Sequence, residues 1–492
     1  MNRRKSHKWR NLLLATIGTI IVAVGVFFGV QFATKTGVFR VPGVVYYGEN
    51  LFEEEKIMLQ NIFTDDVTLD HDVAIDVRQE LKLPELKANE FLINVAVPIT
   101  DFYSSKTDIV AERAGELFRN CSECDFRMID ISELDFSMKL LSINDSYFLD
   151  EFDSGAVFRI MSFDSVDYAK EILPLIDGKI KTVELTKQNV LTLAQTGVTA
   201  LSRGMNRKMN EVDSGAYFAE KIGGFLSQFD LTHTSNESSF SEYANERNIC
   251  SDSRFIDTLT GIGLDIVELT GNHNQDCGDE AAIATVDIYE QNGIMTVGGG
   301  KDKDAASIPL NIDEKGTRIT MLAYNLSTGG ATYDNTPGAN QYYEEVAAAQ
   351  ISEAKARGDF MIVDIQYYEC SEYATTEEYT YCDAADSAAG NQIGLFRHLI
   401  DLGADIVVGT SAHQPQTYEL YGDGEIYYGL GNLFFDQVWW PGTTRSLILV
   451  HYFANNRLLQ TKIVPTVYDE SMQTTLLDNP AWFIERLVNA RP

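Results

Sequence analysis

Residues 269–278 read LTGNHNQDCG and continue the apolar run LDIVEL, so polar side chains appear where an expected strand ends. Two downstream segments have the same order: GTSAHQPQ at 409–416 follows ADIVV, and YYGLGNLFFD at 427–436 begins in an apolar run. In α/β folds, ligands and catalytic groups gather at the carboxyl ends of strands. The three segments therefore predict one polar pocket in an α/β domain.

Alternating strands and helices surround these segments from about residue 190 onward. The expected strands are 264–269, 317–325, 359–368, 404–410, 425–432 and 445–453, and the expected helices are 255–263, 280–293, 343–358 and 393–403. Gly293, Gly358 and Gly403 end the last three helices, and glycine is a common C-cap because it tolerates a left-handed conformation. The spacing is typical of βα units.

The first 35 residues predict a membrane anchor. Residues 12–30 contain no charged side chain, and their number matches the apolar length that spans a bilayer. Five basic residues lie within the first ten, which predicts a cytoplasmic amino terminus. A cleaved signal peptide is the alternative, but the apolar run is longer than a signal core and no small-x-small site follows it. We expect a basic tail at 1–10, a single transmembrane helix at 11–33 and an extracytoplasmic remainder at the cell membrane.

Residues 37–188 predict a small α/β domain. FLINVAVPIT at 91–100 is typical of a buried strand, and residues 107–118 predict a helix. Further apolar patches cover 138–143 and 156–161, but no cluster of polar residues in this region predicts a site.

The formal net charge of −33 bears on the partners of the chain. So acidic a body repels nucleic acid, which excludes the usual basic-groove mode of binding it. The simplest explanation for the acidic residues is a well-solvated surface.

Six cysteines favour disulfide bonds in an extracytoplasmic protein over redox catalysis. Spacing alone suggests the nearest pairs, which are Cys121 with Cys124, Cys250 with Cys277, and Cys370 with Cys382.

Five segments in order resemble the CapA family, named for a poly-γ-glutamate capsule synthesis protein, whose domain is similar to calcineurin-like metallophosphatases. The segments are GVTALSRGM at 197–205, THTSNESSF at 232–240, LDIVELTGNHNQDCG at 264–278, VDIQYYECSEY at 363–373, and the stretch 403–437. The resemblance implies a four-layer αββα sandwich over residues 189–492. It also implies a site at the carboxyl ends of the central strands.

The resemblance carries roles onto particular positions. The GNH motif falls on Asn272 and His273, the N-x-E-like segment on Asn236 and Glu237, the second histidine of GHxxH on His413, and the arginine after the first strand on Arg203. It implies His273 and Glu237 as catalytic groups, and Asn272, Glu237 and His413 as ligands of one divalent ion of Mn, Fe or Zn. Further expected binding residues are Arg203, Asn236, Gln366, Glu369, Gln414 and Asn432.

Three positions depart from the family pattern. Val198 stands where an aspartate is usual, Gln366 replaces the histidine of an HWGxE segment, and Thr410 replaces the first histidine of GHxxH. Valine offers no ligand, and glutamine and threonine bind metals weakly compared with carboxylate or imidazole. These departures argue against a two-metal centre.

Each candidate also has a purely structural alternative. Asn272 and His273 are alternatively a loop cap, and His413 is alternatively a structural loop histidine. In so acidic a chain, the alternative for Glu237 and Glu369 is that they lie near the motifs by chance. The alternative for Arg203 is that it forms an ion pair on the surface.

Two hypotheses from different classes remain. The first is an anchored, metal-dependent hydrolase that acts on an anionic cell-envelope polymer or its precursor, alongside other polymer synthesis proteins. The second is a non-catalytic protein without a metal, which binds the polymer or assists its export through hydrogen-bonding side chains.

Overall fold

The computed structural model describes residues 45–47, 51–65, 73–112, 117, 125–176, 185–326, 329–367, 391–410 and 412–492. The predicted basic tail and transmembrane segment lie outside these residues, as do Glu369 and four of the six cysteines. Within the described residues, no helix has both the length and the apolar character needed to cross a membrane.

Contacts divide the chain into two compact units. The first contains residues 1–95 and 158–182, and the second contains residues 96–157 and 183–492. The segment predicted as one small domain, 37–188, thus contributes to both units, because residues 96–157 cluster with the carboxyl-terminal part of the chain. Strands β3 (Glu90–Asp101) and β8 (Ser154–Phe163) each contain a unit boundary.

The first unit is built from strands and two helices. Its elements besides parts of β3 and β8 are β1 (Val45–Tyr47), α2 (Glu53–Asp65), β2 (Val73–Lys82) and α4 (Val166–Ile176). β2 alternates buried Val73, Ile75 and Val77 with more exposed residues, so one face of the strand contributes to the core.

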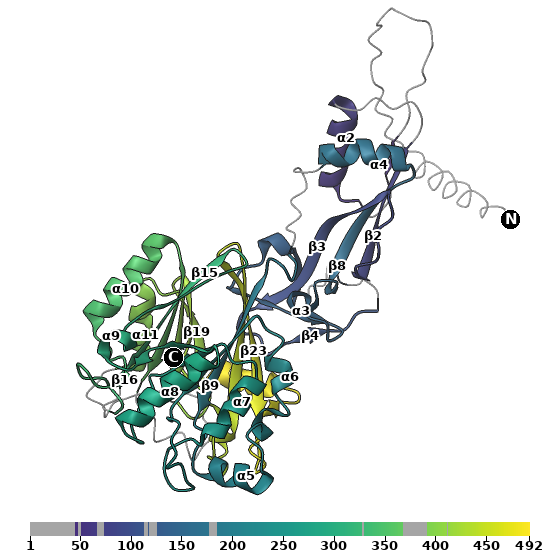
Figure 1. The fold of residues 1–492 in the computed structure, drawn as a ribbon. Coiled ribbons are helices and arrows are strands. Elements are labelled where there is room, and N and C mark those ends of the chain that lie inside the picture. The colour runs from purple at the N-terminus through teal and green to yellow at the C-terminus, as the bar shows by residue number, and fades with distance from the viewer. Residues whose placement is uncertain are drawn as a thin grey trace, which may run out of the picture. The chain divides into compact units, whose positions relative to one another are not determined.

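The second unit contains two large sheets (Figure 1). The first sheet has the order β12-β11-β10-β9-β22-β23-β24, with β21 also paired to β9. Its strands are β9 (Leu191–Thr199), β10 (Leu231–Asn236), β11 (Ile266–Glu268), β12 (Met295–Val297), β21 (Asn432–Phe434), β22 (Arg445–Ala454), β23 (Arg457–Val467) and β24 (Thr475–Leu476). β9 to β12 and β21 run parallel, whereas β22 is antiparallel to β9.

The second sheet has the order β14-β15-β17-β18-β20-β19. Its strands are β14 (Leu310–Glu314), β15 (Thr317–Asn325), β17 (Phe360–Gln366), β18 (Ile406–Thr410), β19 (Tyr418–Tyr421) and β20 (Gly424–Tyr427). The four strands β15, β17, β18 and β20 are parallel. The predicted βα pattern is therefore confirmed as a mixed α/β fold.

Helices accompany both sheets. They are α5 (Gly204–Val212), α6 (Gly223–Leu226), α7 (Ile256–Gly261), α8 (Asp279–Gln291), α9 (Lys303–Ala306), α10 (Glu344–Arg357), α11 (Gln392–Asp401) and α12 (Ala481–Asn489). α10 and α11 pack on one face of the second sheet through Ile351, Phe396 and Leu399. Gly293, Gly358 and Gly403 all have positive φ, as expected for residues that end helices.

The main core lies between the two sheets. Leu193 and Leu449 of the first sheet share one buried cluster with Met321, Ile362 and Val408 of the second. Face-to-face packing of this kind explains why these strands are apolar on successive residues, since both faces of each sheet are covered.

Residues 96–157 add short strands to this unit. They are the second half of β3, β4 (Asp108–Ile109), β5 (Arg127–Asp130), β6 (Met138–Leu140) and β7 (Ser142–Ile143), followed by the short helix α3 (Phe148–Glu151). The predicted helix at 107–118 is wrong where the structure describes it. Asp108 and Ile109 instead pair in parallel with β7, and Ser142 N donates to Thr107 O at 3.0 Å.

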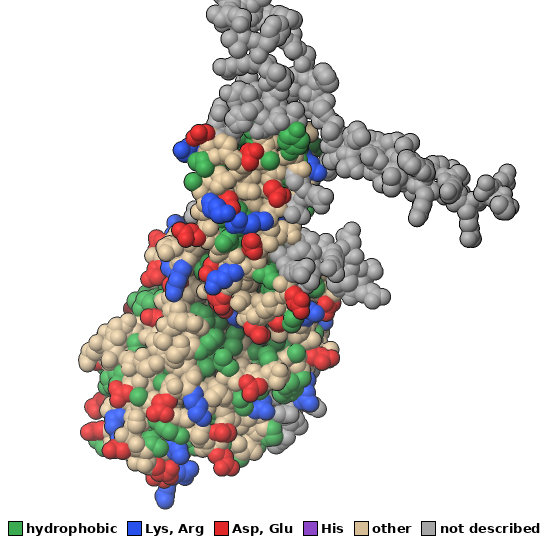
Figure 2. Space-filling model, turned by 90° about the vertical axis from the view of Figure 1, so that its right-hand side faces the viewer, with side chains coloured by type: hydrophobic (Ala, Val, Ile, Leu, Met, Phe, Trp, Pro, Cys, Tyr) green, Lys and Arg blue, Asp and Glu red, His purple; other side chains and the backbone are tan. Residues whose placement is uncertain are grey.

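Acidic and basic side chains are intermixed on the surface. On the face shown in Figure 2, Asp and Glu side chains are spread among Lys and Arg side chains. The excess of acid is thus distributed over this face, as on an ordinary solvated surface.

Candidate functional site

Most of the predicted site residues lie at the ends of strands. Asn236 ends β10 and precedes Glu237, Asn272 and His273 follow β11, Gln366 ends β17, His413 follows β18, and Asn432 begins β21. The parallel register places Gln366 beside Thr410 and Asn236 beside Thr199. The carboxyl ends of β10, β11, β17 and β18, together with the start of β21, therefore carry the candidate site.

Gly271 allows two of the site loops to approach each other closely. A Cβ atom on this residue would lie 2.6 Å from Glu237 Cα and 2.9 Å from Asn236 O. Contacts this short do not occur between real side chains and backbone, so only glycine fits. The glycine of the GNH motif is therefore needed to bring that loop against Glu237.

Glu237 and His413 form a buried pair. Glu237 is 1 % exposed and His413 is 4 % exposed, and 3.7 Å separates Glu237 Oε2 from His413 Nε2. His413 Nδ1 lies 2.9 Å from Asn432 Oδ1. Because an amide oxygen only accepts hydrogen bonds, Nδ1 donates to Asn432 and the opposite nitrogen faces the carboxylate.

Phe435 extends this pair towards Arg203. Its ring centroid lies 5.2 Å from that of His413 and 4.7 Å from the guanidinium carbon of Arg203. Arg203 in turn forms an ion pair with Asp436, whose other oxygen accepts from Gly204 N at 3.0 Å. We call Glu237, His413, Phe435, Arg203 and Asp436 the central cluster.

The backbone of Arg203 is strained. Its φ of +50° is a value that residues with a side chain rarely adopt. Strain of this kind persists only where the surrounding contacts hold it in place, and such positions are often functional. The ion pair with Asp436 and the stacking on Phe435 supply those contacts.

Asn272 and Gln366 connect the two sheets through their amides. Gln366 Nε2 donates to Asn272 Oδ1 at 2.8 Å. Asn325, which lies beside Gln366 in the register of β15 and β17, donates to Thr270 O at 2.6 Å. Neutral donors and acceptors thus bridge the GNH loop to the end of β17.

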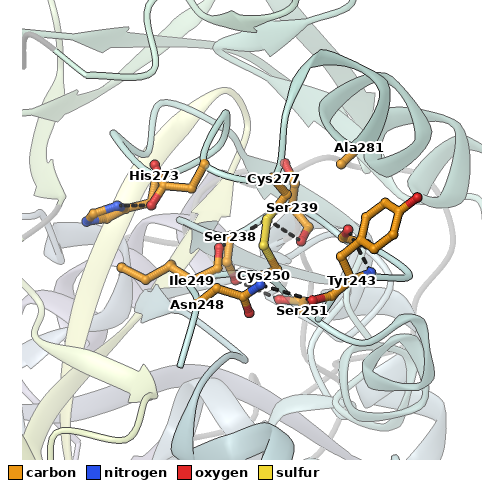
Figure 3. The surroundings of a disulfide bond; sticks show 12 residues. Ser238, Ser239, Tyr243, Asn248, Ile249, Cys250, Ser251, His273, Cys277 and Ala281 are labelled. Atoms are coloured by element: carbon orange, nitrogen blue, oxygen red, sulfur yellow. Dashed lines mark hydrogen bonds and ion pairs between the residues drawn. A yellow bond between two sulfur atoms is a disulfide. The ribbon is translucent and has the colours of Figure 1, made fainter. Parts of the chain in front are cut away.

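His273 lies in a more exposed setting. Its Nδ1 is 2.8 Å from Asp276 Oδ2, and the two side chains are 28 % and 41 % exposed. Figure 3 shows the ring extending away from the disulfide bond. The structure therefore pairs His273 with Asp276, whereas it pairs Glu237 with His413.

The remaining predicted residues have different surroundings. Asn236 accepts from Thr199 Oγ1 at 3.2 Å and donates to Ser238 O at 2.8 Å, so both ends of its amide shape the loop. Gln414 is buried next to His413 in the sequence, at 1 % exposure. Glu369 lies outside the described residues.

A disulfide bond joins the loops that follow β10 and β11. Cys250 and Cys277, which spacing had paired, are bonded across a sequence separation of 27 (Figure 3). Next to it, Ser238 Oγ and Ser251 Oγ lie 2.7 Å apart, and Asn206 Nδ2 donates to Cys250 O at 2.9 Å. The bond thus ties the segment after Glu237 to the segment after His273.

The described residues lack a cluster of the charged and imidazole side chains that most often bind metals. Within the ranges the structure describes, no group of three His, Cys, Asp or Glu side chains is arranged to hold a metal ion. A catalytic zinc site takes three protein ligands; Glu237 and His413 supply two, and the family resemblance implies the amide of Asn272 as the third. Val198, at the position of a usual ligand, is 1 % exposed and packs against Ala200 and Phe435.

A second polar group is buried between the sheets, outside the predicted site. Gln195 Nε2 donates to Asp364 Oδ1 at 2.6 Å, and His233 Nε2 lies 3.1 Å from the other oxygen of Asp364. On the other side, His451 lies 3.3 Å from Gln195 Oε1 and 2.9 Å from Thr461 Oγ1. A line of hydrogen-bonding side chains therefore crosses the core.

Two carboxyl groups belong to this buried group. Burial and the negative charge of Asp364 raise the pKa of Glu268 to about 7. Burial also raises the pKa of Glu425, which accepts from Thr461 Oγ1 at 2.6 Å, to about 7. Burial and the nearby His233 lower the pKa of His451 to about 3. These shifts favour neutral forms in the core.

Several of these residues carry no signal in the motifs that predict the site. Asp276, Phe435 and Asp436 lie inside the quoted motifs but carry no family role. The signal for the buried group is a charged residue within an otherwise apolar strand, as in LDIVE and FMIVD. Such a residue, flanked by buried neighbours, predicts a buried charge.

Known proteins resemble the part of the chain that holds the central cluster. The family described as bacterial capsule synthesis protein PGA_cap matches residues 192–437. The chain is 27% identical over 210 residues to the capsule biosynthesis protein CapA of Bacillus anthracis, covering 41% of this chain and 47% of that protein. It is also 27% identical over 210 residues to the PGA biosynthesis protein CapA of Bacillus subtilis (strain 168), covering 42% and 51%.

The matched region therefore spans about half the length of these curated relatives. Among solved structures, a hypothetical protein from Thermus thermophilus is 13% identical, with a TM-score of 0.34. That similarity covers 57% of this chain and 100% of the Thermus chain.

Proposed function

Because the chain belongs to the PGA_cap family of bacterial capsule synthesis proteins, we propose that it acts in the biosynthesis of poly-γ-glutamate or a related cell-envelope polymer. The names of the two Bacillus relatives support this process. The two stacked sheets, with helices α10 and α11 on an outer face, support the metallophosphatase-like αββα sandwich that the family resemblance implies.

We further propose that the protein binds the polymer or its precursor without metal chemistry. The observation that carries this proposal is Val198, which packs on Phe435 at the position of a usual metal ligand. A polymer of amides and carboxylates needs donors and acceptors, which Gln366, Asn272 and Gln414 supply as neutral groups. His413 and Arg203 of the central cluster are the basic groups beside them.

The same proposal places the protein at the cell membrane. The uncharged run at 12–30, preceded by basic residues, supports a single amino-terminal span with the body outside the cytoplasm. The Cys250–Cys277 disulfide supports an oxidising environment for that body. A tethered polymer-binding protein of this kind would work next to other polymer synthesis proteins.

A metal-dependent hydrolase is the second candidate, and the His273–Asp276 pair favours it. A histidine held by a carboxylate and partly open to solvent is a typical general acid or base. In that candidate, Asn272, Glu237 and His413 would hold one Mn, Fe or Zn ion, which would act as a Lewis acid.

Binding to a defined γ-glutamyl decamer by titration calorimetry tests the first proposal. We expect His413→Gln and Gln366→Leu to weaken binding about tenfold, which corresponds to ~1.4 kcal/mol each. His398→Gln is the matched control, because His398 is 40 % exposed on α11 and pairs with Glu344. Equal affinity of all three variants and the unmodified chain would rule out the candidate site as the binding site.

Elemental analysis of the purified protein separates the two candidates. Metal below about 0.1 ion per chain is expected for the binding protein. Stoichiometric Mn, Fe or Zn that disappears in an Asn272→Ala, His413→Ala double variant would instead establish the metal-dependent candidate.

A further inference from the structure

A cavity of about 260 Å³ lies within the second unit, away from the predicted site. Residues of β6, β7, β23 and the start of α12 line it. Its wall is largely apolar and includes Phe102, Leu140, Tyr418, Val464, Leu477 and Ile484. None of the predicted site residues lines it, so a ligand here would not compete for the central cluster.

Hydrogen bonds hold the walls of this cavity in place. Gln460 Oε1 accepts from Leu140 N at 2.6 Å, and Gln460 Nε2 donates to Met138 O at 2.9 Å. Leu420 N donates to Tyr103 Oη at 2.8 Å on the side of Tyr418. The cavity is therefore preformed, which lowers the entropy cost of binding a small molecule.

Two lysines line the apolar cavity. Lys462 forms an ion pair with Asp150 at 2.7 Å, and its ammonium lies 4.2 Å from the centre of the Tyr147 ring. Lys139 Nζ donates to Ser104 O at 2.6 Å, and no carboxylate of the described residues forms an ion pair with it. Burial lowers the pKa of Lys139 to about 8.

The positive charge of Lys139 is thus uncompensated inside the cavity. An ammonium group has three donors, and the backbone oxygen of Ser104 takes one of them. Asp145 also lines the cavity but is exposed, so water screens its charge. In a chain of net charge −33, a half-buried lysine without an ion-paired carboxylate is an unusual arrangement.

We propose that this cavity binds a small organic anion that has one carboxylate and a short apolar body. The carboxylate would pair with Lys139 and lie near Lys462, and the apolar body would contact Leu140, Val464 and Ile484. At about 30 Å³ per water-sized group, the cavity accommodates roughly eight or nine non-hydrogen atoms. One uncompensated charge suits a monoanion better than a phosphate dianion, and a neutral apolar ligand would leave the ammonium unpaired.

Hexanoate is a suitable probe, and hexanamide is its neutral counterpart of the same size. We expect the purified full-length chain to bind hexanoate saturably in titration calorimetry at pH 7. Hexanamide should bind at least about tenfold more weakly, because it lacks the charge that pairs with Lys139. Equal binding of the two compounds, or no saturable binding of hexanoate, would overturn the proposal.

The pH dependence supplies a second readout. Above its pKa of about 8, Lys139 must take up a proton to pair with a carboxylate, so affinity should fall as pH rises. From pH 8 to 9.5 the loss is about 16-fold if Lys139 alone titrates, because the protonated fraction falls from about one half to about 3 %. The other charged or titratable groups that line the cavity are Asp145, Tyr147, Tyr418 and Lys462, and Asp150 forms an ion pair with Lys462. Burial raises the pKa values of the two tyrosines further from this range.

Lys139→Met tests the residue directly. We expect it to weaken hexanoate binding at least tenfold and to abolish the pH dependence, whereas Lys303→Met on α9, an exposed position, should change neither. If Lys139→Met does not fold, Lys462→Met and the hexanamide comparison on the unmodified chain decide the question. Unchanged binding in a folded Lys139→Met protein would refute the assignment.

Discussion

Replacing Glu268 by glutamine is expected to stabilise the folded protein above neutral pH and to leave it unchanged near pH 4.5. Glu268 is fully buried at the end of β11, where its Oε1 accepts from Thr270 N at 2.6 Å. Burial, and then the negative charge of Asp364, raises its pKa from 4.5 to about 7. Glutamine has nearly the same shape as the neutral acid and does not ionise.

The sign and size of the effect follow from the two pKa values. Below pH 4.5 the carboxyl group is neutral in both the folded and the unfolded chain, so its full contribution to stability is present. As pH rises, the unfolded chain releases the proton first, and this contribution is lost until the folded-state pKa of about 7 is passed. A difference of about 2.5 pH units corresponds to ~3 kcal/mol.

The assay is urea unfolding of the unmodified chain and of Glu268→Gln at pH 4.5 and pH 8. Three of the four tryptophans, Trp439, Trp440 and Trp482, belong to the second unit, so fluorescence reports on the unit that contains Glu268. The variant should gain about 3 kcal/mol in the free energy of unfolding at pH 8, relative to its effect at pH 4.5.

Comparison at each pH removes the contributions of other groups. Glu425 and His451 have shifted pKa values too, but they are present in both proteins and cancel in the difference. Glu280→Gln on the exposed surface of α8 is the matched control and should show no pH-dependent gain. The reasoning fails if the effect of Glu268→Gln is the same at both pH values, or if the variant is less stable at pH 8.

Two further predictions concern the backbone. Replacing Cys250 and Cys277 together by serine should lower the free energy of unfolding by about 3.5 kcal/mol, because the disulfide bond closes a loop of 27 residues. A urea midpoint unchanged from that of the disulfide-bonded chain would contradict this prediction. Gly298→Ala should destabilise by about 2 kcal/mol more than Gly293→Ala in the same assay. Both glycines have φ +73°, so the backbone strain of the substitution is the same at the two positions. A Cβ atom at 298 would lie 2.5 Å from Ala323 Cβ, whereas one at 293 would have no atom within 4 Å. Equal losses in the free energy of unfolding would show that crowding at 298 is unimportant.

Local pattern was sufficient for most of the second unit. The strand expected at 317–325 is β15 with the same limits, and the helices expected at 343–358 and 393–403 are α10 and α11 within two residues. These elements are apolar with a clear period and end at glycines. Their limits therefore depend on nearby residues, which a sequence shows directly.

Long-range contacts were not predictable in the same way. The sequence of residues 107–112 is compatible with a helix, but Asp108 and Ile109 form a strand that pairs with β7. Residues 96–157 join the second unit through contacts such as that of Leu140 with Gln460, and no local feature indicates that partner. Tertiary pairing overrode the local preference.

The candidate site was predictable by position more than by role. The motifs correctly placed Glu237, Asn272 and His413 at strand ends. The partners of each side chain depend on packing, and so the pairing of His273 with Asp276 and the stacking of Phe435 between His413 and Arg203 needed the structure. The metal and catalytic roles stay predictions.

The hydrogen bonds between Gln460 and the β6 strand have a consequence for synthesis of the chain. Leu140 and Gln460 are 320 positions apart, and translation adds about 5–20 residues per second. The β6 segment therefore leaves the ribosome roughly 15–60 s before its partner exists. During that interval water takes the place of Gln460 at the Leu140 amide, and the apolar side chains of β6 lack the contacts that the last strands provide.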